Sequence, residues 1–174
     1  RAICDRHGIL LIFDEVITAF GRVGAATGAE RFGVTPDLIT MAKGLTNAAV
    51  PMGAVAVRRE VHDMIVNTAP EGIELFHGYT YSGHPLACAA AIATLDLYQE
   101  EGLFDRARSL EEAWAAGVHS MKGVRHVIDC RNFGLIGGIE LEPRPDAPTK
   151  RAMEIFHRAF DEGHILDVLE RNRL

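Results

Sequence analysis

Two apolar runs near the start of the chain predict two neighbouring strands of a sheet. The first run, Ile9 to Val16, shows no alternation of apolar and polar residues before it reaches Asp14 and Glu15. The second run, Leu38 to Ala42, is followed directly by Lys43. Runs without alternation are typical of strands that are buried on both faces, as in a parallel sheet.

The polar residues that end these runs are the first candidates for function. In open parallel sheets, ligands lie just beyond the carboxyl ends of the strands. Asp14 and Lys43 both stand at such ends. The two strands therefore bring one carboxylate and one amine to the same edge of the sheet.

The rest of the chain alternates between predicted strands and helices. Pro85 suits the first position of a helix, and Gly102 separates that helix from an amphipathic one with apolar residues spaced three and four apart. The expected elements are a strand at Ala54–Val57, helices over 58–67, 85–101 and 103–121, strands at 124–129 and 135–141, and a helix from Thr149 to about Glu162.

This order of elements predicts an α/β fold class with two domains. Strands alternating with helices indicate an α/β domain, and the later hairpin and helix indicate the start of a second, α+β domain. We place the boundary between residues 121 and 122, so that 1–121 form the first domain and 122–174 belong to the second.

Composition narrows the classes of partner. The net charge of −6 argues against a nucleic-acid partner or an anionic membrane surface. The longest apolar stretch, Pro85 to Leu97, is too short to span a bilayer. Three cysteines that lie far apart, Cys4, Cys88 and Cys130, predict neither a disulfide framework nor a metal site, and they suit a cytoplasmic protein with reduced thiols.

The opening residues predict the last turns of a helix. Residues 2–7 lead into Gly8, which has the character of a helix C-cap. A native chain seldom begins inside a helix that leads into a buried strand. We therefore interpret the 174 residues as a fragment.

A carboxylate such as Asp14 at a buried strand end requires a positive partner. Within this chain Lys43 could supply it, and otherwise a metal ion or a cationic nitrogen of a ligand could. An ordinary ion pair or helix cap is the plainer explanation for an isolated strand-end aspartate.

Lys43 also has a plain and a chemical interpretation. A lone lysine is most often a solvated charge. Here the small residues Ala42 and Gly44 flank it, and they leave room for a bulky group beside the amine. A desolvated lysine is readily deprotonated and can form a Schiff base with a carbonyl compound.

A P-loop ATPase is an alternative explanation of the first run. An apolar strand that ends in Asp-Glu also describes the magnesium-binding strand of that class. The class requires the pattern G-x-x-x-x-G-K-[ST], which does not occur in this chain. The alternative also leaves Lys43 without a role.

A specific resemblance appears when four motifs are taken together. They are Asp14-Glu15-Val16, then Lys43 twenty-nine residues later, then Pro51-Met52-Gly53-Ala54, and then Gly78-Tyr79-Thr80-Tyr81-Ser82-Gly83-His84-Pro85. In this order and spacing they resemble the class III aminotransferases, which are pyridoxal-phosphate enzymes of fold type I. The stretches 77–82 and 131–135 resemble the omega-amino acid (β-alanine):pyruvate transaminases within that class.

The resemblance implies a role for each candidate residue. Asp14 matches the acid that pairs with the pyridine nitrogen of pyridoxal 5'-phosphate, and Lys43 matches the lysine that forms the Schiff base. Val16 matches the residue that packs on the cofactor ring, although ordinary core packing would also explain it. Thr80 matches the hydroxyl that binds the cofactor phosphate from the partner subunit, although a hydroxyl in a turn is the plainer alternative. Glu15 is expected to form structural hydrogen bonds beside Asp14.

The resemblance also implies a fold, an activity and an assembly. The chain would be the C-terminal part of the large cofactor domain, with a mostly parallel sheet and flanking helices, plus the start of the small α+β domain. The implied reaction is transamination from an omega-amino acid or amine to pyruvate or a similar keto acid, in a cytoplasmic full-length protein that forms a homodimer or a higher homo-oligomer. An aminomutase, a decarboxylating transferase and an inactive interface-only fragment remain alternatives.

Two departures from the family pattern predict that this chain alone is inactive. The family's N-terminal half, with the glycine-rich phosphate cradle and the aromatic ring that stacks on the cofactor, is absent. Residues 164–174 do not follow the expected pattern, and the arginine that binds the substrate carboxylate is missing.

Overall fold

The computed structural model of the chain describes residues 1–70, 75, 77 and 79–164. The chain divides into two compact units, Arg1–Glu111 and Glu112–Leu174. The boundary at residues 121 and 122 stays a prediction, because compact units of this chain need not coincide with the domains of a longer protein.

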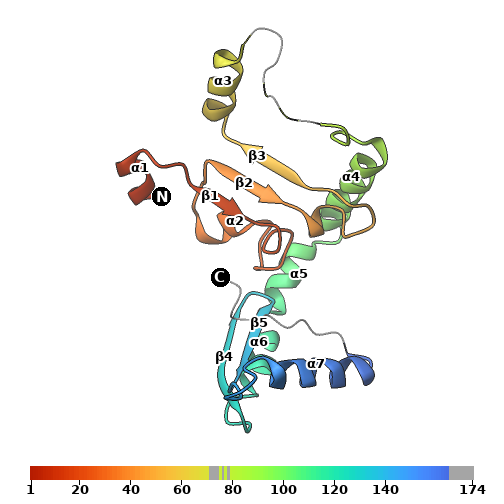
Figure 1. Cartoon of the computed structure of the whole chain (residues 1–174). Helices are drawn as coiled ribbons and strands as arrows, with labels where there is room; N and C mark the ends of the chain where they lie inside the picture. Colours follow the sequence, from red (N-terminus) through yellow and green to blue (C-terminus); the bar gives the residue numbers. More distant parts are fainter. Residues whose placement is uncertain (71–74, 76, 78, 165–174) are drawn as a thin grey trace. The chain divides into compact units, whose positions relative to one another are not determined.

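The first unit contains a three-stranded sheet and short helices (Figure 1). In chain order its elements are α1 Ala2–His7, β1 Ile12–Asp14, α2 Gly28–Phe32, β2 Leu38–Met41, the 3₁₀ helix η1 Lys43–Leu45, β3 Ala54–Val57, α3 Arg59–Thr68, α4 Pro85–Glu100 and α5 Leu103–Ser109.

The sheet has the order β1-β2-β3, so that β1 lies at an edge. β1 and β2 are parallel, with Ile12 opposite Leu38 and Asp14 opposite Thr40. Parallel neighbours need a crossover connection, and residues 15–37 with α2 provide it. β3 pairs antiparallel with β2. In the described part of the chain the sheet is therefore mixed, as happens where an antiparallel strand borders a parallel sheet.

The predicted burial of the first strand on both faces is wrong for this chain. Ile9, Leu10 and Ile12 are 56%, 53% and 57% exposed. β1 has a strand neighbour on one side only, and the buried apolar side chains of the unit come from loops and helices, namely Ala19, Val23, Ala25, Leu45, Ala87, Ala91 and Ala107. The apolar side chains of this strand are thus left exposed by the other described residues.

The amino ends of β1 and β2 are held by a buried carboxylate, Asp37, which is 4% exposed. It accepts a hydrogen bond from the backbone N–H of Leu11 at 2.7 Å, and it pairs with Arg1 at 2.6 Å and Arg58 at 2.8 Å. The Leu11 N–H and the two guanidinium groups hold the pKa of Asp37 well below its usual value. The cluster therefore joins α1 and β1 to the segment between β3 and α3.

The predicted starts and ends of the helices are confirmed in part. Gly8 caps α1 in the left-handed conformation, and α4 begins at Pro85. The single helix predicted over 103–121 is instead two helices, α5 and α6 Glu111–His119. Ser109 Oγ donates to the carbonyl oxygen of Arg106 at 2.8 Å, and such local side-chain bonds compete with helix continuation.

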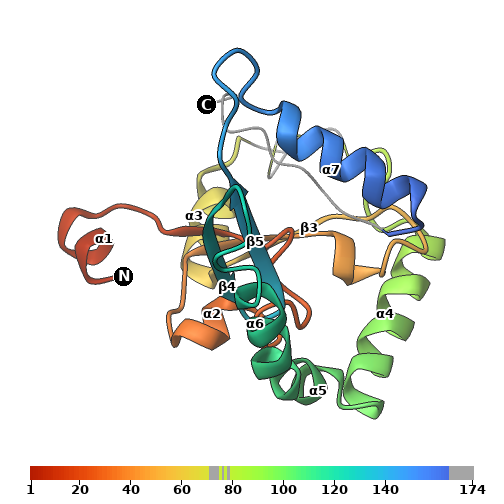
Figure 2. The same cartoon turned by 90° about the horizontal axis from the view of Figure 1, so that it is seen from below.

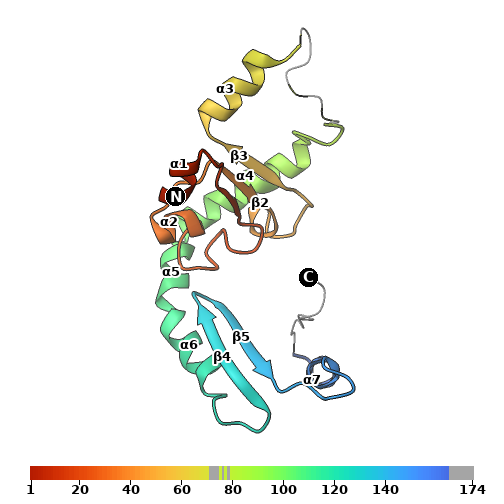
Figure 3. The ribbon, with the colours of Figure 1, turned by 60° about the vertical axis from the view of Figure 1, so that its left-hand side comes forward.

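The second unit is built on an antiparallel hairpin (Figure 3). Its strands are β4 Val127–Phe133 and β5 Ile136–Leu141, and the helix α7 Lys150–Asp161 follows. β4 begins later and runs further than predicted, because Asn132 and Phe133 pair with β5 and the turn is shortened to two residues.

Helix α6 lies against this hairpin at Gly137. A methyl group built on Gly137 would lie 2.7 Å from Val118 Cγ2 and 3.1 Å from Trp114 Nε1. Only glycine lets the helix approach so closely. Among the residues described, no helix has the length and apolar character that crossing a membrane requires.

Candidate active site

Asp14 and Lys43 lie at the same edge of the sheet, as the two apolar runs predicted. Asp14 is the last residue of β1 and stands opposite Thr40 of β2. Lys43 follows β2 by two residues. Because β1 and β2 are parallel, both side chains belong to the carboxyl ends of the strands, where α/β proteins bind ligands.

The carboxylate of Asp14 is exposed and only lightly hydrogen-bonded. Its Oδ1 accepts from the backbone N–H of Val16 and from Thr40 Oγ1, both at 3.1 Å. Within the described ranges, no ion pair joins it to Lys43. The expected burial of Asp14 is therefore not found in this chain, and its Oδ2 is left for a donor outside the described residues.

The neighbouring carboxylate of Glu15 is fully engaged, and the predicted structural role is confirmed. Glu15 is 2% exposed. It accepts hydrogen bonds from Thr18 Oγ1 at 2.6 Å and from the N–H groups of Gly28 and Ala29 at 2.7 and 2.8 Å. Two adjacent carboxylates thus have different tasks: Glu15 fixes the first turn of α2, and Asp14 faces outward.

The backbone of Lys43 has an unusual conformation. Its φ is +47°, in the left-handed region that residues other than glycine seldom adopt. Such a residue costs about 1–3 kcal/mol and persists where the surrounding structure determines it. The side chain is exposed, between the half-buried residues Ala42 and Gly44. The amine is therefore presented outward rather than desolvated.

The other two predicted site residues lie in less constrained surroundings. Val16 is half-buried, directly after Glu15. Thr80 is exposed, in the turn that precedes α4. The structure does not bring Thr80 together with Asp14 and Lys43. The predicted role of Thr80, binding the cofactor phosphate from a partner subunit, stays a prediction. Gly78, part of the same motif, lies outside the described residues.

Sequence reasoning missed three residues that surround the candidate site. Thr40 donates to Asp14, Tyr98 of α4 donates to the carbonyl oxygen of Gly44 at 2.7 Å, and Phe20 packs against Gly44. Figure 2 shows the orange turn after β2 beside α4. An aromatic residue in an otherwise small-residue loop, as at Phe20, was the one available signal.

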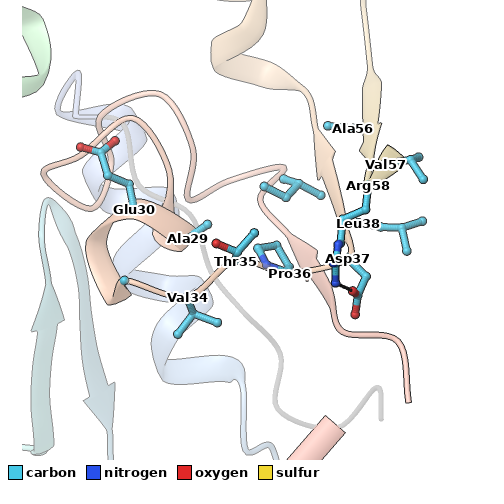
Figure 4. Close-up of a pocket in the computed structure, with 12 residues that line it drawn as sticks. Ala29, Glu30, Val34, Thr35, Pro36, Asp37, Leu38, Ala56, Val57 and Arg58 are labelled. Carbon is cyan, nitrogen blue, oxygen red and sulfur yellow. Dashed lines mark hydrogen bonds and ion pairs between the residues drawn. The ribbon is translucent and has the colours of Figure 1, made fainter. Parts of the chain in front are cut away.

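A groove elsewhere on the first unit is not part of this site. It is lined by residues of α2, β2, β3 and their connections, among them Thr35, Pro36, Asp37 and Arg58 (Figure 4). Asp37 and Arg58 point toward each other there, joined by their ion pair. The groove therefore borders the amino end of β2, whereas Asp14 and Lys43 stand at the carboxyl end. In the described part of the chain, no cluster of histidine, cysteine and acidic side chains is arranged to hold a metal ion.

Asp14 and Lys43 suit a cofactor that carries both a carbonyl group and a basic ring nitrogen. The open Oδ2 of Asp14 can accept a hydrogen bond from a protonated ring nitrogen. The Lys43 amine can attack a carbonyl carbon. It is exposed, whereas the space that a side chain at Gly44 would need is filled by Phe20. These residues fit the class of enzymes that bind pyridoxal phosphate through a lysine.

Comparison with known proteins identifies the family. The family model for the class-III aminotransferases matches residues 1–172, and the chain belongs to this family. Class III aminotransferases depend on pyridoxal 5'-phosphate. The predicted fold class, fold type I, is confirmed by similar solved structures. One is a taurine:2-oxoglutarate aminotransferase from Bifidobacterium kashiwanohense, described in complex with PLP and glutamate, with a TM-score of 0.84 and 32% identity over 98% of this chain and 39% of that one.

Two relatives point to a subgroup. The chain is 66% identical to an omega-aminotransferase of Caulobacter vibrioides, over 97% of this chain and 38% of that protein. It is 51% identical to a beta-alanine–pyruvate aminotransferase of Pseudomonas aeruginosa, over 94% of this chain and 37% of that protein. The chain thus spans less than two fifths of the length of these relatives.

Proposed function

We propose that the complete protein carrying this chain transfers an amino group from an omega-amino acid or amine to pyruvate or a similar keto acid. The observation that supports the reaction class is the placement of Asp14 and Lys43 at one edge of the parallel strand pair. The substrate class is supported by the activities for which the two relatives are named.

Each site residue has a task in this proposal. Bound pyridoxal phosphate supplies an electron sink that stabilises negative charge at the substrate carbon. Lys43 would hold the cofactor covalently and, once released, would move a proton to and from that carbon. Asp14 would keep the ring nitrogen protonated, Val16 would pack on the ring, and Thr80 would donate a hydrogen bond to the phosphate.

The electrostatic role of Asp14 requires that its carboxylate be shielded from water, and the described residues do not shield it. Two unit charges about 4 Å apart attract by about 1 kcal/mol in water and by about 4 kcal/mol at an effective dielectric of 20. Asp14 is exposed in this chain, so its surroundings here are closer to the first value. We therefore propose that water is excluded from the site by the rest of the protein and by the partner subunit of a homodimer. That partner subunit would also supply Thr80.

The decisive experiment maps the covalent attachment. The complete protein is loaded with pyridoxal phosphate, reduced with borohydride and digested, and the labelled peptide is identified by mass spectrometry. We expect the label on Lys43, and Lys43→Ala should abolish both label and turnover, since acid-base help alone is worth about 10²–10⁴-fold. Lys122→Ala is the matched control and should keep both. A label on another lysine would refute the assignment.

The chemistry after attachment separates the alternatives within the family. A transaminase requires a keto-acid acceptor for repeated turnover, whereas an aminomutase does not, and a decarboxylating transferase releases carbon dioxide. We expect β-alanine consumption to depend on added pyruvate. A P-loop ATPase has no support in the family match, and an interface-only fragment predicts no label.

We also propose that residues 1–174 alone are inactive as a transaminase. Asp14 and Lys43 are both exposed in this chain, and an exposed imine gains little from preorganised groups. Turnover of the isolated chain within about tenfold of the complete protein, equivalent to about 1.4 kcal/mol in barrier, would contradict this.

A further inference from the structure

The residue after the candidate lysine is held by a side chain from a distant helix. Tyr98 of α4 donates its hydroxyl proton to the carbonyl oxygen of Gly44 at 2.7 Å. The two residues are 54 positions apart in the chain. Gly44 directly follows Lys43, so this hydrogen bond holds the peptide group between Gly44 and Leu45, one residue beyond the one that carries the amine.

An aromatic cluster also packs at Gly44. Phe20 stacks on Tyr98 with ring centroids 6.0 Å apart, and Phe104 lies 5.2 Å from Tyr98. A methyl group built on Gly44 would lie 2.8 Å from Phe20 Cβ, closer than real side chains approach. Phe20 thus fills the space in which a side chain at position 44 would lie.

The donor state of Tyr98 is secured by its surroundings. Burial raises the pKa of its phenol, against a smaller lowering by Arg22. The hydroxyl is therefore protonated at neutral pH and donates to Gly44. Among the described residues, the hydroxyl has no other hydrogen-bond partner.

The turn after Lys43 is fixed from its far end as well. Leu45 is 7% exposed and Thr46 is 2% exposed. Thr46 Oγ1 donates to the carbonyl oxygen of Val50 at 2.5 Å. With Gly44 held by Tyr98 and Phe20, the chain has little freedom directly after Lys43, the residue with the left-handed φ of +47°.

We propose that Tyr98 is a positioning residue for Lys43: by fixing the Gly44 carbonyl, it holds the lysine in its left-handed conformation and aims the amine toward the cofactor. This inference rests on the proposed function in one respect, namely that the cofactor is what the amine reacts with. The placement of the amine by Tyr98 is a separate claim about the folded protein and has its own readout.

The principal test uses Tyr98→Phe in the complete protein, because this change removes the hydroxyl and keeps the ring stack. Thr94→Val is the matched control, since Thr94 lies on the same helix and its hydroxyl donates within that helix to Ala90. Two rates are measured: formation of the borohydride-trapped link between pyridoxal phosphate and the apoprotein, and the half-reaction with saturating donor. Thermal stability is followed in parallel.

The expected result is a loss in rate without a matching loss in substrate binding. Tyr98→Phe should slow link formation and the half-reaction by roughly two- to tenfold, the range set by one neutral hydrogen bond, while KM stays within twofold. Thr94→Val should leave both rates unchanged. Rates for Tyr98→Phe equal to those of the parent would overturn the proposal, as would equal losses in both variants.

A second measurement works without the cofactor. The apoprotein is treated with a limiting amount of acetic anhydride, and acetylation of Lys43 is measured relative to Lys122 in the same molecule. Tyr98→Phe should change this ratio at least twofold, and Thr94→Val should not. If the parent protein forms no link at Lys43, the proposed function fails, and the acetylation ratio still decides whether Tyr98 positions the amine; an unchanged ratio overturns the positioning role.

Discussion

The carboxylate of Glu15 lies so close to Gly28 that the position accepts no side chain without displacement. A methyl group built on Gly28 would lie 3.1 Å from Glu15 Oε1, and the N–H of Gly28 donates to Oε2 at 2.7 Å. Because Glu15 directly follows Asp14, this contact fixes the backbone from which the outward-facing carboxylate extends.

Replacing Glu15 with glutamine should destabilise the protein with little change in shape. The amide keeps one acceptor oxygen but turns an NH₂ group toward backbone donors, so at least one hydrogen bond to an ionised acceptor is lost. Bonds of that kind are worth about 1.5–3 kcal/mol, and we expect a loss of that size in the free energy of unfolding, measured by urea denaturation of the complete protein. Glu30→Gln is the control, because the exposed Glu30 accepts one backbone bond at 3.2 Å.

Asp14→Asn should separate cofactor binding from chemistry. The amide keeps the shape of the side chain and its bond from Thr40, but it removes the negative charge that would hold a protonated ring nitrogen. We expect the cofactor to stay bound while the single-turnover rate with saturating donor falls by orders of magnitude, as measured by stopped-flow absorbance. Asp96→Asn, on the exposed surface of α4, should react normally, and a normal rate for Asp14→Asn would rule out the electron-sink role.

Thr80→Ala should weaken retention of the cofactor more than it slows the reaction. A hydrogen bond to a charged phosphate is worth about 1.5–3 kcal/mol, so the cofactor Kd should rise by roughly ten- to hundredfold. Equilibrium dialysis measures this, with Ser82→Ala in the same exposed turn as the control. An unchanged Kd would leave Thr80 as an ordinary turn residue.

Asp37 predicts a pH dependence of stability. Its pKa in the folded protein is held below the usual value, first by the Leu11 N–H and then by Arg1 and Arg58. A lowered folded pKa stabilises the protein above the unfolded pKa of about 3.9, and that stabilisation is lost as the pH falls toward the folded value.

We therefore expect the difference in unfolding free energy between the parent and Asp37→Asn to be constant from pH 7 to about 5 and to shrink below about pH 4. Urea denaturation across this range is the measurement. A difference that stays constant down to pH 3 would mean that the charge of Asp37 contributes nothing.

Local pattern was sufficient for the elements that carry the candidate chemistry. The apolar runs that end at Asp14 and before Lys43 predicted both strands, and parallel pairing then placed the two residues at one edge. Gly8 and Pro85 marked helix ends because their backbone requirements are local. These features depend on a few adjacent residues, which a single sequence displays.

Features that depend on distant parts of the chain could not be predicted in the same way. The exposure of Ile12 depends on what covers the sheet, and no property of residues 9–16 reports that. The bond from Tyr98 to Gly44 joins a helix to a turn through the fold. The division of α5 from α6 is likewise not marked in the sequence, because the apolar spacing over 103–121 continues across it.

Under the proposed function, the left-handed backbone at Lys43 sets activity against folding stability. Glycine adopts a φ of +47° without steric cost, whereas lysine does not. A sequence selected for stability alone would carry glycine at position 43, and it would have no amine to offer. Proteins commonly give up stability where a site needs a strained residue. Any programme to stabilise this enzyme by consensus or design would have to exempt position 43, together with Tyr98, Phe20 and Gly44, which we propose hold its conformation.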